Sequence, residues 1–246
     1  MTKETAAARH PALTGLIAGL AAALGPRLRS VVLYGSAARG DQRTRTVDMN
    51  LLVVIDRLDA ETLDAMRPAL RQWTRARQPL PRFFTPELIA ESADVFPIEF
   101  HDIRSHGAIL HGDDPLARIV LRRDHLRLQY EREMREKLMR LREGYLQTDL
   151  KPADLNRLLV VSWGAFVALF RGCLHLMEAK VPLHDADVVT AFCGRAGIDP
   201  APFEEVERLR RGGAAADPRG LFVRYHRSIE EAVHRVNRFD QAGGAS

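Results

Sequence analysis

Cysteine is scarce in this chain of 246 residues, which has only Cys173 and Cys193. Two isolated cysteines are too few for a disulfide framework, and no Cys/His cluster has the spacing of a zinc site. Both lie in apolar sequence with a helical pattern, so we expect buried and reduced thiols. This cysteine usage fits a reducing compartment, and we expect a cytoplasmic protein.

Hydrophobic runs long enough to cross a membrane are missing as well. The most apolar stretch, residues 158–170, is shorter than the ~20 residues that span a bilayer, and Arg157 and Arg171 flank it. Near the start, residues 13–24 carry their large apolar side chains on one helical face, which favours an amphipathic helix over a signal peptide. We therefore expect no membrane partner.

The excess of one charge is small, with 36 Lys plus Arg against 32 Asp plus Glu and a net charge of +4. A mild excess does not by itself require a nucleic-acid partner. No basic strip with interleaved aromatics indicates RNA binding either. If the excess of Lys and Arg needs an explanation, a polyanionic nucleotide as partner is enough.

Two apolar runs carry the residues that point most clearly to chemistry. The first run, residues 31–34, ends at Gly35 and Ser36, where a strand would turn into a helix and offer free backbone N–H groups to an anion. After the eleven-residue spacer 37–47, Asp48 and Asn50 open the second run. Strand alternation aims both side chains to the same side, so two oxygen ligands converge near one phosphate-binding turn.

This ordered pattern resembles the nucleotidyltransferase superfamily, which includes polymerase-beta-like, antibiotic and minimal nucleotidyltransferases. Its signature is an apolar residue, Gly-Gly or Gly-Ser, a spacer of about nine to thirteen residues, and Asp-x-Asp or Asp-x-Glu in a strand. The resemblance covers roughly residues 28–113. It implies an α+β fold with a small mixed sheet flanked by helices, followed by an all-α helical bundle. We expect a first domain over residues 1–114, with an N-terminal helix at 11–25, and a bundle over 115–246.

The resemblance also implies roles for individual residues. Gly35 and Ser36 would hold phosphates. Apart from the resemblance, the basic spacer offers Arg39, close behind Ser36, whose planar guanidinium suits phosphates, although exposed charges are common in loops. Asp48 and the residue at position 50 would bind Mg²⁺, and position 50 is Asn. An amide oxygen can coordinate a hard cation but carries no charge, so a two-ion site would be impaired.

The superfamily's third carboxylate usually lies on a later strand, and the sequence predicts such a strand at residues 97–103. Glu99 is our first choice for this acid and Asp102 the second. Asp48, Asn50 and Glu99 would then form the metal shell. Asp48 and Glu99 would be catalytic, with Glu99 as the base for an acceptor hydroxyl.

The implied function is Mg²⁺-dependent transfer of a nucleoside monophosphate from a triphosphate such as ATP to a hydroxyl on a small molecule or a protein. Asn50 supports an alternative, in which a degraded site senses nucleotides or binds a partner, as in a toxin–antitoxin pair. A third hypothesis is a two-component system in which the nucleotidyltransferase-like half modifies or restrains a helical partner. Beside all three stands a purely structural role, because Gly-Ser turns and strand-entry Asp residues are common. The sequence identifies neither the acceptor nor the base preference. It leaves the oligomeric state open, and a homo-oligomer is compatible with it.

From residue 115 onward the sequence predicts helix after helix. Residues 158–170 should form the central helix, with others at 185–195, 202–211 and 218–239. Arg227 and His234 loosely fit the Arg/His pattern of HEPN-type ribonucleases. Such pairs arise easily in an arginine-rich chain, so we interpret this one as surface charge.

Overall fold

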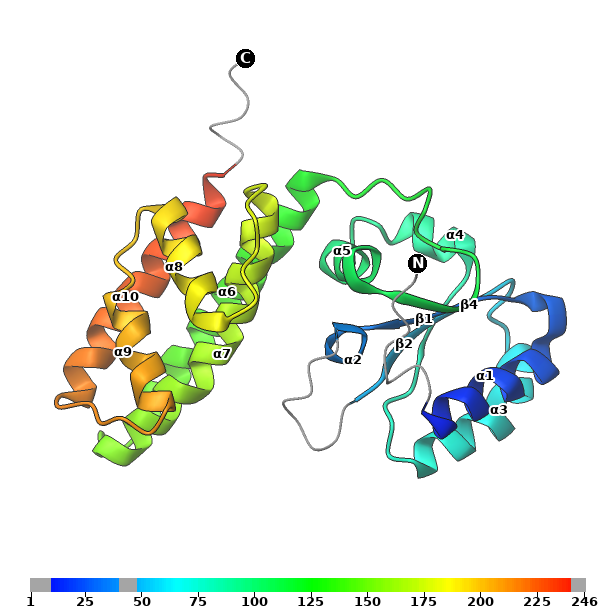
Figure 1. The fold of residues 1–246 in the computed structure, drawn as a ribbon, viewed down its shortest axis with the longest axis horizontal. Coiled ribbons are helices and arrows are strands. Elements are labelled where there is room, and N and C mark those ends of the chain that lie inside the picture. The colour runs from blue at the N-terminus through cyan, green and yellow to red at the C-terminus, as the bar shows by residue number, and fades with distance from the viewer. Residues whose placement is uncertain (1–9, 40–47, 240–246) are drawn as a thin grey trace, which may run out of the picture. The chain divides into compact units, whose positions relative to one another are not determined.

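The computed structural model describes residues 10–39 and 48–239, without the side chains of Ser36 and Arg39. Its contacts divide the chain into two units, Met1–Arg122 and Arg123–Ser246 (Figure 1). The segment after the predicted boundary at residue 114 packs on the first unit, because Leu116 is buried in a core cluster there. The Arg104 guanidinium also donates a hydrogen bond of 3.1 Å to the Leu116 carbonyl.

The first unit is built on a four-stranded mixed sheet of order β3-β2-β1-β4. The central strand β1 (Leu28–Tyr34) pairs antiparallel with both β2 (Asn50–Ile55) and β4 (Ala108–Gly112). The short edge strand β3 (Arg82–Phe84) runs parallel to β2. Because β1 and β2 are antiparallel, the end of β1 meets the start of β2.

Helices cover both faces of this sheet (Figure 1). On one face, α1 (Pro11–Leu24) and α3 (Ala60–Arg75) pack over the alternating side chains of β1 and β2. The other face buries Val32, Leu52 and Val54 against α4 (Pro86–Glu91) and α5 (Pro97–His106). A 3-10 turn, η2 (Gly25–Arg27), joins α1 to β1. The amphipathic N-terminal helix that the sequence predicts is confirmed as α1.

Residues 97–103, predicted as a strand, form the helix α5 instead, so that prediction is wrong. Pro97 occupies its first turn with Glu99, and Arg104 lies in its last turn, which is the charge order that a helix macrodipole favours. Its buried side chains, Pro97, Phe100 and Ile103, recur every three residues. This spacing of the buried residues is that of one helical face and not of a pleated strand.

The segment after α5 forms one edge of the sheet. Residues 108–112 form β4, which pairs with β1 through Leu33 and Ala108 at one end and Ser30 and Gly112 at the other. Gly112 has φ +70°, and a Cβ there would lie 1.8 Å from the Arg29 carbonyl oxygen. Glycine ends this strand because the backbone of β1 passes too close for a side chain.

The second unit is a helical bundle. Its helices are α6 (Arg123–Leu146), α7 (Pro152–Leu176), α8 (Asp185–Ala196), α9 (Ala201–Arg210) and α10 (Pro218–Asn237). The apolar face of α7 contacts each of the other four, which confirms it as the central helix. Cys173 and Cys193 are free and buried, as expected, and burial raises the pKa of the Cys193 thiol to about 12.

Helix α7 extends well beyond the predicted residues 158–170. Among the described helices, it alone is long and apolar enough to cross a membrane by length and composition. However, 44% of its most apolar window is buried inside the protein. Core helices of bundles have the same length and apolar composition.

Candidate functional site

The predicted phosphate-binding turn forms at the end of β1. Gly35 has φ +76°, a conformation that glycine adopts without strain, and the chain then enters α2 (Ser36–Arg39). A helix of four residues is too short for a substantial macrodipole. Any anion at this turn would therefore depend on individual backbone N–H groups. Residues 40–47 of the spacer, with Arg43 and Arg45, lie outside the described residues.

Asn50 lies beside this turn, as the sequence predicts. It is the register partner of Tyr34, and a Cβ built on Gly35 would lie 3.1 Å from its Nδ2 atom. Met49 is buried in the α1/α3 core, so alternation directs Asn50 to the opposite face. Asp48 is exposed just ahead of the strand. Asn50 is therefore half-buried beside the glycine turn, and Asp48, two residues earlier in the chain, is exposed.

Gln78 fixes the backbone at this point, a contact that the sequence did not indicate. Its Oε1 atom accepts a hydrogen bond of 2.9 Å from the Met49 N–H. Gln78 belongs to the loop after α3, far from residue 49 in sequence. The bond holds the entrance to β2 in place and so positions the residues on either side of Met49.

Arg82 is the functional candidate that sequence reasoning missed. It opens β3 and pairs with Leu52, which puts its side chain on the same face as Asn50. The Arg82 Nη1 atom lies 3.6 Å from the Glu99 Oε1 atom. The helix α5 thus brings Glu99 to this face, although by a helix and not by the predicted strand. Only the parallel pairing of β3 with β2 reveals the position of Arg82, so no local pattern in the sequence could have found it.

Aromatic contacts hold α5 over the sheet at this point. Phe84 of β3 packs edge-on against Phe100, with ring centroids 5.7 Å apart, and against Phe96, with centroids 6.1 Å apart. Phe100 follows Glu99 directly. Packing of these rings therefore fixes the turn of α5 from which Glu99 reaches Arg82.

Burial and the same charged groups affect the pKa of the Tyr34 phenol. Burial raises this pKa above the usual value, Glu99 and Asp102 raise it further, and Arg82 opposes them. The phenol therefore remains a neutral hydrogen-bond donor at physiological pH. Tyr34 is also the register partner of Asn50 and packs, half-buried, against the core cluster that contains Phe100 of α5. We refer to Tyr34, Gly35, Asn50, Arg82 and Glu99 as the β1 corner.

The donor set at the β1 corner bears on its metal chemistry. Among the described residues, no group of three or more His, Cys, Asp or Glu side chains is arranged to hold a metal ion. Asp48 is a carboxylate two positions before Asn50, while Glu99 faces the Arg82 cation. Mg²⁺ often takes one or two protein oxygens and fills its octahedron with waters and substrate phosphates. This set suits one such ion and does not suit a two-ion cage.

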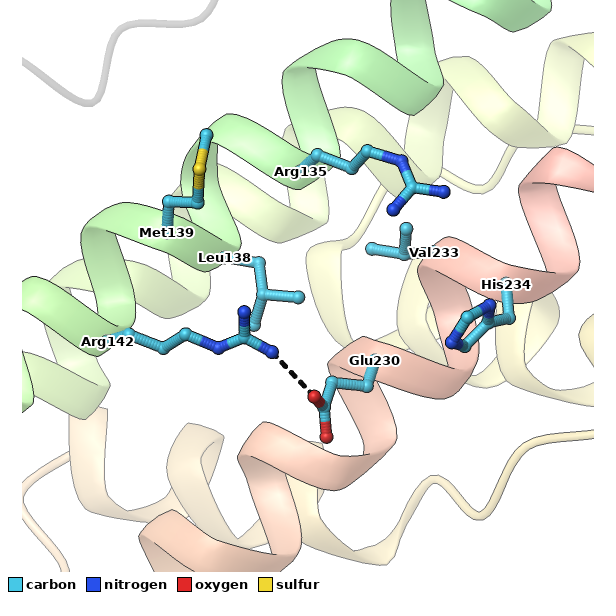
Figure 2. A pocket seen from close by; sticks show the side chains of 7 residues that line it. All are labelled: Arg135, Leu138, Met139, Arg142, Glu230, Val233 and His234. Carbon is cyan, nitrogen blue, oxygen red and sulfur yellow. Dashed lines mark hydrogen bonds and ion pairs between the residues drawn. The ribbon is translucent and has the colours of Figure 1, made fainter.

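The helical unit contains a separate groove of about 280 Å³ between α6 and α10 (Figure 2). The charged side chains that line it already form ion pairs with other side chains of this unit. The Arg142 Nη2 atom lies 2.6 Å from Glu230 Oε1, and Arg135 binds Glu131 at 2.8 Å. His234 lines the groove and Arg227 does not, so the Arg/His pair that the sequence suggests is not gathered there.

The comparisons with known proteins address the fold. No family model and no curated protein matches this chain. Among solved structures, the chain is similar to the spectinomycin adenyltransferase AAD(9) from Enterococcus faecialis, whose crystal structure contains ATP and spectinomycin. The TM-score is 0.53 at 13% sequence identity, and the match covers 92% of this chain and 98% of that chain. The predicted fold, a small mixed sheet with flanking helices followed by a helical bundle, is confirmed.

Proposed function

We propose that this chain, which has the nucleotidyltransferase fold, binds a nucleoside triphosphate at the β1 corner and transfers its nucleoside monophosphate to a hydroxyl. One observation supports this most directly. The strand register places Asn50 against the glycine turn that ends β1. A phosphate-binding turn and cation ligands are the two components that such a reaction needs.

In the proposed reaction, the acceptor oxygen forms a bond to the α-phosphorus of the triphosphate. The bond from that phosphorus to the oxygen bridging to the β-phosphate breaks, and pyrophosphate leaves. The acceptor's proton passes to the Glu99 carboxylate, the base that the superfamily resemblance implies. No oxidant or reductant is needed.

Two groups of residues bind the substrate in this proposal. Gly35, Ser36 and Arg39 hold the phosphates. Asp48 and Asn50 offer oxygens to one Mg²⁺, which would supply positive charge against the triphosphate. A small molecule is the favoured acceptor, because the similar solved structure was obtained with ATP and spectinomycin.

Calorimetric titration of the four ribonucleoside triphosphates with Mg²⁺ tests this function without knowledge of the acceptor. The Asp48→Ala variant should bind about tenfold more weakly in Mg²⁺, because it removes the charged oxygen beside Asn50. Asp64→Ala is a matched control, since Asp64 is an exposed carboxylate on α3 that pairs only at the surface with Arg67. Binding that is equal in all three proteins, or absent from all three, would contradict the proposal.

A nucleotide sensor with a degraded catalytic site is the second candidate function, and two observations favour it. Asn50 carries no charge, and the Arg82 cation faces Glu99 at 3.6 Å. A sensor would bind ATP but release no pyrophosphate with any hydroxyl acceptor. Pyrophosphate release in a screen of aminoglycoside and aminocyclitol acceptors would exclude this candidate.

A further inference from the structure

The β1 corner contains less negative charge than a two-metal site requires, and it contains a cation in addition. Asn50 is neutral, and Asp48 is exposed ahead of the strand. Arg82 lies on the same face of the sheet, since its register partner Leu52 and the next residue of that face, Phe84, are both buried against α4 and α5. The β1 corner therefore contains the permanent positive charge of Arg82, whereas a metal site would need carboxylates to bind its cation.

The Arg82 guanidinium remains accessible to a ligand. Its side chain is 51% exposed, and that of Glu99 is 30% exposed. A guanidinium carries five N–H donors, and one carboxylate oxygen at 3.6 Å cannot occupy them all. The ion pair between the two is therefore open to an additional or competing anion.

A triphosphate would compete well for this cation. It carries more negative charge than one carboxylate, and its oxygens match the planar fork of arginine in a bidentate geometry. Gly35 and Asn50 lie on the same corner, since Asn50 is two residues from Leu52 along β2 and touches the glycine turn. A phosphate at the turn would thus lie near Arg82.

We propose that Arg82 is a phosphate-binding residue that supplies positive charge in place of a divalent ion, so that the chain binds ATP even when no divalent cation is present. This inference rests on the proposed function, because it concerns the same site. When the triphosphate binds, the guanidinium shifts its interaction from Glu99 to the phosphates. The Glu99 carboxylate then no longer faces the Arg82 cation.

The test is calorimetric titration of ATP into the full chain in EDTA and, separately, in Mg²⁺. We expect ATP to bind in EDTA with a dissociation constant about tenfold weaker than in Mg²⁺. Arg82→Gln should weaken binding in EDTA by about tenfold to a hundredfold, the range of a lost charge-assisted hydrogen bond. Glu99→Gln should tighten it, because the competing carboxylate is removed.

Two control variants isolate the role of Arg82. Arg29→Gln removes an exposed arginine that pairs with Asp56 at the opposite end of the same sheet, and it should leave ATP binding unchanged. Arg82→Lys keeps the charge without the fork and should bind at an intermediate strength. Thermal melts of every variant show whether the sheet domain still folds, so that weak binding is not mistaken for unfolding.

The outcomes separate this inference from the function on which it rests. Binding that appears only in Mg²⁺ overturns the role of Arg82 and leaves the proposed function standing. Equal affinities for the wild type and Arg82→Gln in EDTA also overturn it. Absence of ATP binding in both buffers overturns the inference and the proposed function together.

Discussion

Replacing Gly35 by alanine tests whether the turn at the end of β1 is shaped for a ligand. At φ +76°, an alanine costs about 1–2 kcal/mol in left-handed backbone strain. Alanine also reduces the freedom of the unfolded chain, which returns about 0.4–1 kcal/mol. The new Cβ would meet Asn50 Nδ2 at 3.1 Å, and moving that amide off its rotamer costs about 0.5–1.5 kcal/mol. We expect a net loss of roughly 1–2 kcal/mol.

Gly197→Ala is the matched control for this substitution. Gly197 ends α8 at φ +66°, so it has a similar backbone conformation, but a Cβ there meets no atom within 4 Å. Its substitution should cost only about 0.5–1 kcal/mol. It should leave ATP binding unchanged, whereas Gly35→Ala should weaken it at least tenfold.

Thermal denaturation and ATP calorimetry of the two variants provide the measurement. Adding Asn50→Ala to Gly35→Ala should remove the steric part of the cost, giving a coupling energy of about 0.5–1 kcal/mol in a double-mutant cycle. If Gly35→Ala costs no more stability than Gly197→Ala and binds ATP normally, the close approach of Asn50 to the turn is wrong.

Three further predictions concern stability. Gly172→Ala on α7 should destabilise the bundle by about 1–3 kcal/mol in thermal melts, because its Cβ would lie 2.2 Å from the Tyr130 hydroxyl. Gly164→Ala on the same helix should instead stabilise the bundle by about 0.5–1 kcal/mol. Equal shifts in the two variants would refute this packing. Burial lowers the pKa of His226, so the unfolded chain binds this proton more readily than the folded one, and stability falls as pH drops below about 6.5. Thermal melts of His226→Gln at several pH values should show a weaker dependence on acid than those of the wild type. Hydrogen bonds from arginine lower the pKa of Glu207, so its carboxylate stabilises the fold above the unfolded-state pKa, and this stabilisation is lost as pH falls through the folded value. Glu207→Gln should therefore reduce the free energy of unfolding by roughly 1–2 kcal/mol near neutral pH and little in strong acid. A cost that does not change with pH would contradict the charge-based reason.

The sequence contained enough information to predict the centre of the sheet, because local patterns determine it. Alternation and a glycine turn marked β1 and the start of β2, and the same alternation placed Asn50 on the face away from the α1/α3 core. The helical periodicity of the second unit predicted α8, α9 and α10 to within a few residues.

Other features depend on contacts between distant segments. The segment with Phe96, Ile98 and Phe100 has the alternation of a strand, but Pro97 and the rings of β3 favour a helix there. Similarly, β4 forms because β1 has an open edge to pair with, which no local signal in residues 108–112 reveals.

The composition of the site shows the same division. Gly35 and Asn50 could be identified from spacing, but Arg82 could not, because its place depends on the parallel register of a three-residue edge strand. Arg82 also pairs with Glu99, so a cation lies beside the residue that the sequence predicts as the third metal-binding carboxylate. The metal shell of Asp48, Asn50 and Glu99 remains a prediction, and the charge of Arg82 is the main reason to test it.

Hydrogen exchange measured by mass spectrometry, with and without ATP, tests the central claim most directly, because it reports where a nucleotide binds. The account predicts slower exchange on ATP addition in peptides covering Gly35 with α2 and the start of β2, and little change at the groove between α6 and α10. Slower exchange confined to that groove, or no change anywhere at saturating ATP, would contradict it.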